Sequence, residues 1–509
     1  MDVTQILMLI TILVYLAAMV GIGAVLAKQN QTTDDFYLGG RTLGPLVTAM
    51  SAEASDMSSW LLMGLPGVAY LSGTADAAWT AIGLAIGTYV NWLVVAKRLR
   101  NYTHVCGNST TLPLFFSNRY RDNKRILSVI AALLIIIFFV PYTASGFAAC
   151  GKLFANLFGM DYLPAMLISA IVIVAYTTLG GFLAASTTDF VQSIVMTIAI
   201  VVVFGFGISK VGSFSAVMDN AKSMAGYFSL THTHDVATGT ASPYSLLQIF
   251  STLAWGLGYF GMPHVLLRFM AIGDANKLKL SRRVATVWVV ISMAVSVFIG
   301  VIGNAMTKAG VLPTLKDPET IILVVSDLIS KHGVLATIIA GLILAGILAA
   351  TMSTADSQLL AASSSASQNI LKEVFMKDMS EKTGMLIARI TVLVIALIGV
   401  FIARNPDSSV FQIVSFAWAG FGASFGPLVL LALVWKRSTF QGALCGMVSG
   451  GVMVFVWKFL IRPMGGALGI YELLPAFLLG LAVNVIVSLL TPAPSREVQD
   501  EFDKVASMK

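Results

Sequence analysis

The stretch MSAEASDMSSWLLMGLPG, residues 50–67, has the length and the apolar flanks of a membrane segment, yet it carries Glu53, Asp56 and four serines. A carboxylate near the middle of a bilayer costs about 2.5–3.5 kcal/mol on insertion scales. Irregular backbone at that depth is tolerated only where it lines a cavity or is buried in protein. The stretch ends in GLPG, which favours an interrupted helix. These features predict a polar functional site inside a helical membrane protein.

The composition of the whole chain supports this reading. The chain has 509 residues, of which 57% are hydrophobic and 11% charged, and its mean hydropathy is +0.85. Because soluble proteins carry about 25% charged residues, the composition indicates an integral membrane protein surrounded by lipid. The net charge of +7 is explained by basic loops on one side of a membrane, so we expect no nucleic-acid partner. The first apolar run lacks a basic leader and predicts a retained helix.

Apolar stretches of about 20 residues predict about 13 transmembrane helices, and none shows the alternation of a membrane β-strand. The fold class is therefore predicted as an all-α integral membrane protein. The predicted spans are 6–26, 45–70, 76–96, 126–155, 162–180, 188–208, 243–265, 284–307, 335–363, 385–403, 409–435, 441–461 and 470–491.

Lysine and arginine are concentrated in three loops, at 97–125, 277–283 and 436–437. In the predicted helix count these loops lie on one side, which the positive-inside rule makes cytoplasmic. We therefore expect a multi-pass protein of the cell membrane, with its N-terminus outside and the tail 492–509 in the cytoplasm.

The second to sixth and the seventh to eleventh spans form two sets of five, so the second set enters the membrane from the opposite side. Such inverted repeats are typical of transporters, with the site at the repeat interface. Each set begins with a segment rich in glycine and proline, at 50–67 and at 255–264 (WGLGYFGMPH). The predicted division is 1–44 (first helix and cytoplasmic loop), 45–208 (first repeat), 209–242 (outer loop), 243–437 (second repeat), 438–491 (two helices) and 492–509 (tail).

A second polar segment predicts a cation site. In LAGILAATMSTADSQLL and the residues that follow it (344–373), Ala350, Ser353, Thr354 and Ser357 lie on one helical face. Two hydroxyls from this face and carbonyls freed by the first helix break would give the oxygen shell that suits Na⁺. The alternative is that the hydroxyls bond to carbonyls of their own helix.

Several motifs resemble the sodium/solute symporter family, most closely its sodium/proline branch. They are ASDMSSWLLMGLPG (54–67), YTTLGGFLA (176–184), WGLGYFGMPHVLLRFMA (255–271), AATMSTADSQLL (349–360) and ALVWKRSTFQGALCG (432–446). The resemblance covers nearly the whole chain in order. It implies the leucine-transporter fold, with a ten-helix core of two inverted five-helix repeats, one helix before it and two after it.

The resemblance also implies Na⁺ as coupling ion and a small amino acid, L-proline first among them, as substrate. The implied Na⁺ ligands are the carbonyls of Ala54, Met57 and Ala350 and the hydroxyls of Ser353 and Thr354. The implied substrate-binding residues are Asp56, Ser58, Trp60, Tyr142, Trp255, Tyr259 and Pro263.

These aromatic rings suit the substrate, because Trp255 and Tyr259 can pack on a pyrrolidine ring and attract its ammonium group. Core packing is the alternative role for both rings, and Pro263 has the alternative role of keeping the helix break open. Ser59 and Met262 stand where proline carriers have glycine and glutamine. This departure leaves another amino acid, a monocarboxylate or pantothenate as alternative solutes.

A second cation or relay site is implied at Asp189, Asp356 and Ser357, because some members of the family carry an additional sodium site there. Two carboxylates brought together would share a proton or a cation. In the alternative reading Asp189 caps the start of a helix, and Asp356 meets cytoplasmic water or a lysine. Glu53 is assigned either to the lipid interface or to a gate.

The sequence therefore predicts a secondary active transporter that works by alternating access, and no enzyme. An intramembrane enzyme would need a nucleophile with its base or a metal cluster, and the five histidines are scattered. A sensor would need a longer tail than 492–509. The sequence leaves the oligomeric state open.

Overall fold

The computed structural model describes residues 2–28, 32–376, 379–405 and 409–508 and is almost entirely helical. The long helices are α1 (Val3–Ala27), α5 (Thr74–Asn91), α8 (Ile126–Phe158), α9 (Tyr162–Val211), α13 (Leu278–Lys308), α15 (Val334–Ser364), α16 (Glu381–Ala403), α17 (Val410–Val434), α18 (Phe440–Val456) and α19 (Leu473–Leu490). The shorter helices are α2 (Thr33–Leu38), α3 (Pro45–Ser59), α4 (Leu65–Ser72), α6 (Lys97–Val105), α7 (Leu112–Arg119), α10 (Phe214–Ser223), α11 (Leu246–Leu253), α12 (Pro263–Ala271), α14 (Ile321–Ser330) and α20 (Arg496–Ser507). Strands β1 (His232–His234) and β2 (Ala241–Pro243) form a small antiparallel hairpin.

Ten helices in the described part of the chain are long and apolar enough to cross a membrane, judged by length and composition. The predicted span 45–70 is divided between α3 and α4, and 243–265 is divided between α11, a 3₁₀ stretch and α12. The span 162–180 begins as the shorter apolar helix Tyr162–Ala175. The all-α membrane fold is confirmed, whereas the count of 13 helices stays a prediction.

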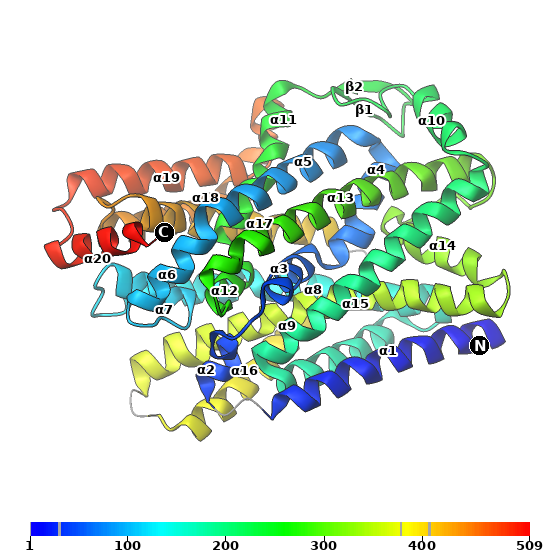
Figure 1. Ribbon diagram of the computed structural model, residues 1–509. Helices are drawn as coiled ribbons and strands as arrows, with labels where there is room; N and C mark the ends of the chain where they lie inside the picture. Colours follow the sequence, from blue (N-terminus) through cyan, green and yellow to red (C-terminus); the bar gives the residue numbers. More distant parts are fainter. Residues whose placement is uncertain (1, 29–31, 377–378, 406–408, 509) are drawn as a thin grey trace.

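The three basic loops gather at one end of the helix bundle. Lys97 donates a hydrogen bond to the Asn276 side chain (3.0 Å), and Arg98 donates to the Leu433 carbonyl (2.9 Å). Figure 1 shows α6, α7 and α20 at this end, which we call the basic end, and α10 and α14 toward the opposite end.

Helix α3 lies in the middle of the bundle (Figure 1) and packs against α9, α12, α13 and α15. Its residues from Thr48 to Ser59 are all buried, Glu53 and Asp56 included. Helix α15 packs in turn against α1, α8 and α9. The polar part of residues 50–67 is therefore enclosed by protein and does not face lipid.

Glycines bring the second interrupted helix against α5. A Cβ atom on Gly87 would lie 2.4 Å from the carbonyl oxygen of Gly256, and one on Gly256 would lie 2.2 Å from that of Gly83. No other residue fits at such an approach. The 3₁₀ stretch Ala254–Gly261 therefore packs on α5 backbone against backbone.

The structure corrects one predicted boundary. Residues 162–180 and 188–208 were expected as two helices with Asp189 at the start of the second. Both helices are present under the label α9, joined at a break at Gly181, whose φ of 63° favours glycine. The second helix begins at this break instead of at residue 188. Asp189 lies inside this helix and is fully buried, so the prediction that it caps a helix start is wrong.

Candidate functional site

The first helix break lies at Ser58. Its φ of 49° and ψ of −173° fall outside the helical region, and such backbone in a residue other than glycine costs about 1–3 kcal/mol. The Ser58 hydroxyl accepts the amide hydrogen of Trp60 (3.1 Å) and so starts the helix again. Strained backbone of this kind is typical of ligand sites, because the carbonyls before it are freed from the helix.

The predicted ion ligands of α3 and α15 meet beside this break. The Ser353 hydroxyl donates to the carbonyls of Ala54 (2.9 Å) and Ala350 (3.2 Å). The Thr354 hydroxyl donates to the Ala350 carbonyl (3.1 Å). This is a bond within its own helix, as the alternative interpretation predicts. The Met57 carbonyl accepts from the amide of Trp60.

The five predicted ligand atoms, three carbonyl and two hydroxyl oxygens, are all oxygens, which suits a hard cation such as Na⁺. A cation there would take over the carbonyls that now accept the two hydroxyl protons. Within the described residues no group of three or more His, Cys, Asp or Glu side chains has the arrangement of a metal site. The donor set therefore fits Na⁺ and does not fit a softer metal.

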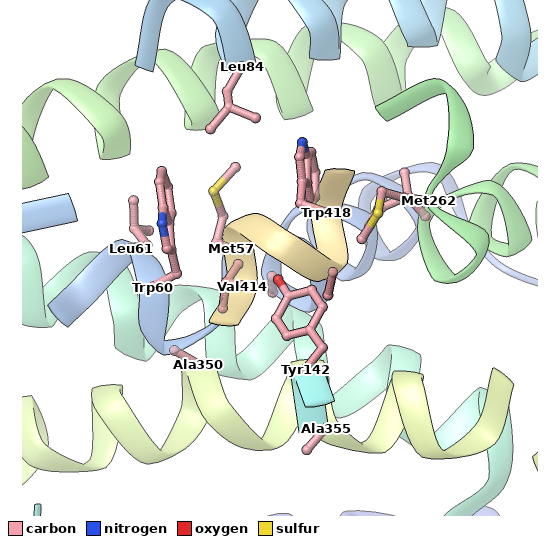
Figure 2. Close-up of a cluster of buried hydrophobic side chains, with 14 of the residues drawn as sticks. Met57, Trp60, Leu61, Leu84, Tyr142, Met262, Ala350, Ala355, Val414 and Trp418 are labelled. Carbon is pink, nitrogen blue, oxygen red and sulfur yellow. The ribbon is translucent and has the colours of Figure 1, made fainter. Parts of the chain in front are cut away.

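A small cavity lies beside the break, and we call it the aromatic cavity. Its volume is about 10 Å³, room for about one water molecule, and it is lined by Asp56, Met57, Trp60, Leu84, Tyr142, Trp255, Met293, Val414 and Trp418. Figure 2 shows Met57, Trp60, Tyr142 and Trp418 arranged around it, with Leu84 reaching in from α5. Asp56 carries the only charge in this lining.

Asp56 has one carboxylate oxygen in use and one without a partner. Oδ2 accepts a short hydrogen bond from the Tyr259 hydroxyl (2.6 Å), and the backbone carbonyl accepts from the Tyr142 hydroxyl (3.2 Å). Oδ1 is buried and has no hydrogen-bond partner among the described residues. An unpaired carboxylate oxygen inside an aromatic cavity is suited to an ammonium group.

A second cavity lies on the other side of Tyr142, and we call it the hydroxyl cavity. Its volume is about 10 Å³, and it is lined by Ser58, Ser59, Tyr142, Thr143, Ser145, Gly146, Thr351, Thr354, Ala355 and Gln358. It adjoins the aromatic cavity through Tyr142 and the ion ligands through Thr354.

The implied substrate residues thus divide between several positions. Asp56, Trp60, Tyr142 and Trp255 line the aromatic cavity, whereas Ser58 lines the hydroxyl cavity. Tyr259 reaches the site through its bond to Asp56. Pro263 lines neither cavity and occupies the first position of α12, where a missing N–H is not needed.

The aromatic cavity is covered at the end opposite the basic end. The Phe411 ring lies against Trp60 and Trp255, at centroid distances of 5.9 and 5.6 Å. Glu319 fixes the start of α17, because it accepts from the Phe411 amide (3.1 Å) and pairs with Lys152 (3.1 Å). Both charged side chains are largely buried, so this contact covers the cavity at this end of the bundle.

Toward the basic end the site is closed by a cluster around Arg268, a residue that is 1% exposed. Its guanidinium donates to Asp189 (3.1 Å), to the Ser51 hydroxyl (3.0 Å) and to the Ser357 hydroxyl (2.5 Å). One side chain of α12 thereby joins α3, α9 and α15. We call these residues the Arg268 cluster.

The predicted second site at Asp189, Asp356 and Ser357 falls in this cluster. Asp356 Oδ1 lies 3.1 Å from the Ser357 hydroxyl, and Asp356 is fully buried. The alternative that Asp356 meets water is therefore wrong, because neighbouring helices cover it. Glu53 is buried too and accepts from the Trp92 indole (2.9 Å), which excludes a place at the lipid interface.

Comparisons with known proteins identify the family to which this chain belongs. The model of the sodium:solute symporter family matches residues 36–450. The chain belongs to the sodium:solute symporter family. It is 41% identical over 502 residues to the sodium/proline symporter of Salmonella typhimurium, covering 98% of this chain and 96% of the relative. It is 40% identical over 489 residues to the osmoregulated proline transporter of Bacillus subtilis, covering 96% of both chains.

Solved structures support the fold of this family member. A Na⁺-coupled sialic acid symporter in a substrate-bound outward-open state superposes with a TM-score of 0.79 at 19% identity, covering 96% of this chain and 99% of the other. A nucleobase-cation-symport-1 family transporter in a closed conformation gives a TM-score of 0.54 at 13% identity, covering 92% and 98%. At these identities the likeness concerns the fold alone, and it confirms the leucine-transporter fold.

Several residues of the site were missed by sequence reasoning. Trp418 lines the aromatic cavity and donates its indole N–H to the Trp255 carbonyl (2.7 Å). Gln358 lines the hydroxyl cavity, and Arg268 closes the site. An arginine inside an apolar segment is itself a signal of function, and the motif 255–271 contained it.

Proposed function

We propose that this symporter-family member couples the inward flow of Na⁺ to the uptake of a small amino acid, L-proline, by alternating access. The observation that carries the proposal is the unpaired Asp56 oxygen in the aromatic cavity, next to an oxygen-only ligand set across the helix break. The names of the relatives at 40–41% identity support proline as the solute.

The proposed sites follow from this arrangement. Na⁺ is held by the carbonyls of α3 and α15 with the Ser353 and Thr354 hydroxyls. The solute lies among the side chains of the aromatic cavity, which move apart to admit it, with its ammonium group at Asp56 and its ring against the tryptophans. Because the ion and the solute contact the same broken helix, binding of one stabilises the backbone that the other needs, which gives coupling.

The two closures around the site suit alternating access. Phe411 and the Lys152–Glu319 pair cover the site on one side, and the Arg268 cluster covers it on the other. We propose that they open in turn. The basic end is proposed to be cytoplasmic, with the N-terminus outside, since lysine and arginine gather there.

The proposed division of the chain keeps the sequence boundaries. It places a first helix and loop at 1–44, the repeats at 45–208 and 243–437, the outer loop at 209–242, two helices at 438–491 and the tail at 492–509.

Equilibrium binding to the purified protein tests the proposal. Labelled L-proline is expected to bind at least about ten-fold more tightly in Na⁺ than in K⁺, because the coupling energy of linked sites is typically 1–3 kcal/mol. A competition panel of other amino acids, a monocarboxylate and pantothenate identifies the preferred solute. If proline ranks last in that panel, the solute assignment is wrong.

Removal of either ligand hydroxyl is expected to raise the Na⁺ concentration for half-maximal proline binding. Ser353→Ala and Thr354→Ala each take away one of the oxygens around the ion, so a shift of about ten-fold is expected. Ser365→Ala serves as control, since its hydroxyl also bonds back to a helix carbonyl (Ala361, 2.9 Å) but lies outside the ligand set. Equal Na⁺ dependence in the ligand variants and the control would place the ion elsewhere.

The aromatic side chains that line the aromatic cavity are expected to contribute more to the affinity for proline than to the affinity for Na⁺. Trp255→Ala removes a ring that lines the aromatic cavity, so proline affinity should fall by about ten-fold or more, in line with large aromatic contacts. The Na⁺ affinity measured without proline should change less than two-fold. A larger change in Na⁺ affinity than in proline affinity would make Trp255 a structural residue of the helix break.

A further inference from the structure

We propose that Tyr471 is a positioning residue for solute binding, because its ring holds Trp255 in place at the aromatic cavity. Tyr471 lies in the connection 457–472 between α18 and α19, two helices that follow the proposed second repeat. The proposal rests on the proposed function. It gives the connection between these two helices a part in binding the solute.

The ring of Tyr471 stacks on the indole of Trp255. The ring centroids are 5.1 Å apart, and the ring planes differ by 21°. The indole also contacts the rings of Trp60, Phe411 and Trp418, at centroid distances of 5.4, 5.6 and 6.2 Å. Among these four contacts, the one with Tyr471 has the shortest distance and the most nearly parallel planes. Trp255 lines the aromatic cavity and Tyr471 does not, so Tyr471 supports the indole from behind.

Tyr471 is itself held by two helices on either side of the second break. Its hydroxyl donates to the Ser415 carbonyl of α17 (2.6 Å), and its backbone amide donates to the Ser251 hydroxyl of α11 (2.8 Å). The residue is buried. Because α11 leads directly into the 3₁₀ stretch that contains Trp255, these bonds fix the ring relative to the backbone on which the indole is mounted.

The connection that carries Tyr471 has a fixed conformation of its own. Glu472 is fully buried, and its carboxylate pairs with Arg462 (2.7 Å) and lies 3.5 Å from the Lys458 ammonium group. The Trp457 indole donates to the Ile470 carbonyl (3.2 Å). Removing one partner of a buried ion pair is strongly unfavourable, so the pair keeps the connection in place whether or not a solute is bound.

Helix α19 continues this support along the second break. It begins at Leu473 and packs on α17 and on the 3₁₀ stretch Ala254–Gly261. Figure 1 shows the start of α19 close to α11. The helix pair α18–α19 therefore contacts the proposed solute site through the backbone and rings of the second break, and is more than an addition on the lipid side.

This arrangement lets Tyr471 act on the solute through Trp255. An indole that is held in one orientation before the solute arrives loses less conformational freedom on binding, which raises affinity. Without the Tyr471 ring, Trp255 can turn away from the solute. The proposed Na⁺ ligands lie on α3 and α15 and do not include the second break, so the ion should be affected much less.

The test is a double-mutant cycle on the purified full-length protein, read by equilibrium proline binding at saturating Na⁺. Tyr471→Ala is expected to weaken proline binding about five-fold or more, in line with the loss of an aromatic stack. In a Trp255→Ala background the same substitution is expected to change proline binding less than about two-fold, because the ring that it positions is gone. Na⁺ affinity without proline should change less than about two-fold in Tyr471→Ala.

Conservative and control variants separate positioning from a general structural role. Tyr471→Phe keeps the ring and is expected to bind proline within about two-fold of the unaltered protein. Tyr471→Leu keeps an apolar side chain without the aromatic ring and is expected to behave like Tyr471→Ala. Trp457→Ala is the matched control, since Trp457 belongs to the same connection but lies outside the lining of the aromatic cavity and bonds to Ile470.

A second measurement reads the indole directly. In protein labelled with 5-fluorotryptophan, the ¹⁹F resonance of Trp255 is the one that Trp255→Phe removes. It is expected to move in Tyr471→Ala and Tyr471→Leu, which take away the neighbouring aromatic ring, and to stay in place in Trp457→Ala. Added proline is expected to shift it in the unaltered protein.

Two results would overturn the proposal. Proline affinity within two-fold of the unaltered protein in Tyr471→Leu or Tyr471→Ala means that Trp255 needs no support from this ring, whatever its resonance does. Equal losses in the unaltered and the Trp255→Ala backgrounds give Tyr471 an effect that does not pass through Trp255. Failure of the unaltered protein to bind any proline in Na⁺ contradicts the proposed function itself, a result distinct from these.

Discussion

Asp56→Asn is expected to reduce Na⁺-driven proline uptake about a hundred-fold or more while the protein still inserts and folds. The amide keeps the size of the side chain and can still accept from the Tyr259 hydroxyl. It removes the negative charge that the solute's ammonium group needs in a buried site, and loss of one partner from a buried charge pair costs about 3–5 kcal/mol. Initial uptake rates and surface expression measure the effect.

Asp76→Asn is the matched control for this variant. Asp76 of α5 also accepts from a tyrosine hydroxyl, that of Tyr244 (3.0 Å), but it lines neither cavity. Its uptake should stay within about two-fold of the unaltered protein, as expected for a substitution away from the site. Near-normal transport by Asp56→Asn would make Asp56 a structural hydrogen-bond acceptor.

The second large effect is expected at the Arg268 cluster. Arg268→Met and Asp189→Asn should each lower the maximal uptake rate about a hundred-fold and the thermal stability as well. Each variant leaves one buried charge without its partner, which costs about 3–5 kcal/mol. The double variant removes both charges, so it should recover thermal stability. It should not recover the uptake rate, because the hydrogen bonds that connect α12 with α3, α9 and α15 through Arg268 are lost.

Thermal unfolding and uptake kinetics of the three variants separate these effects. Arg282→Met is the control, since Arg282 also lies over an aromatic ring (Tyr89, 5.4 Å) as Arg268 does over Phe182 (4.9 Å). If the single variants transport at the normal rate, the cluster is no part of the transport cycle. If the double variant recovers both properties, the ion pair serves stability alone.

Much of the fold could be predicted from local sequence. Stretches of about 20 apolar residues mark the long helices, and glycine with proline inside such stretches marks the two breaks. The Ser353–Thr354 pair was recognisable because its spacing places both hydroxyls on one helical face. These signals are local, and the structure brings the Ser353–Thr354 pair next to the first break at Ser58.

The remainder depends on contacts between distant segments. Arg268 pairs with Asp189 across 79 positions of the chain, and the Phe411 cover depends on Glu319 from another segment. Asp189 was expected to cap a helix because the break that the structure has at Gly181 was predicted to extend from residue 181 to residue 187. Periodicity and spacing within one segment carry no information about such pairs, which are set by the packing of α3, α9, α12 and α15.

The most direct test is the uptake of labelled L-proline by the purified protein in proteoliposomes. An inward Na⁺ gradient is expected to drive transient accumulation of proline above its external concentration, and replacing Na⁺ with K⁺ should abolish it, because only a coupled ion supplies the driving force. Accumulation that is the same in K⁺ as in Na⁺, or none under an inward Na⁺ gradient, would contradict Na⁺-coupled proline transport.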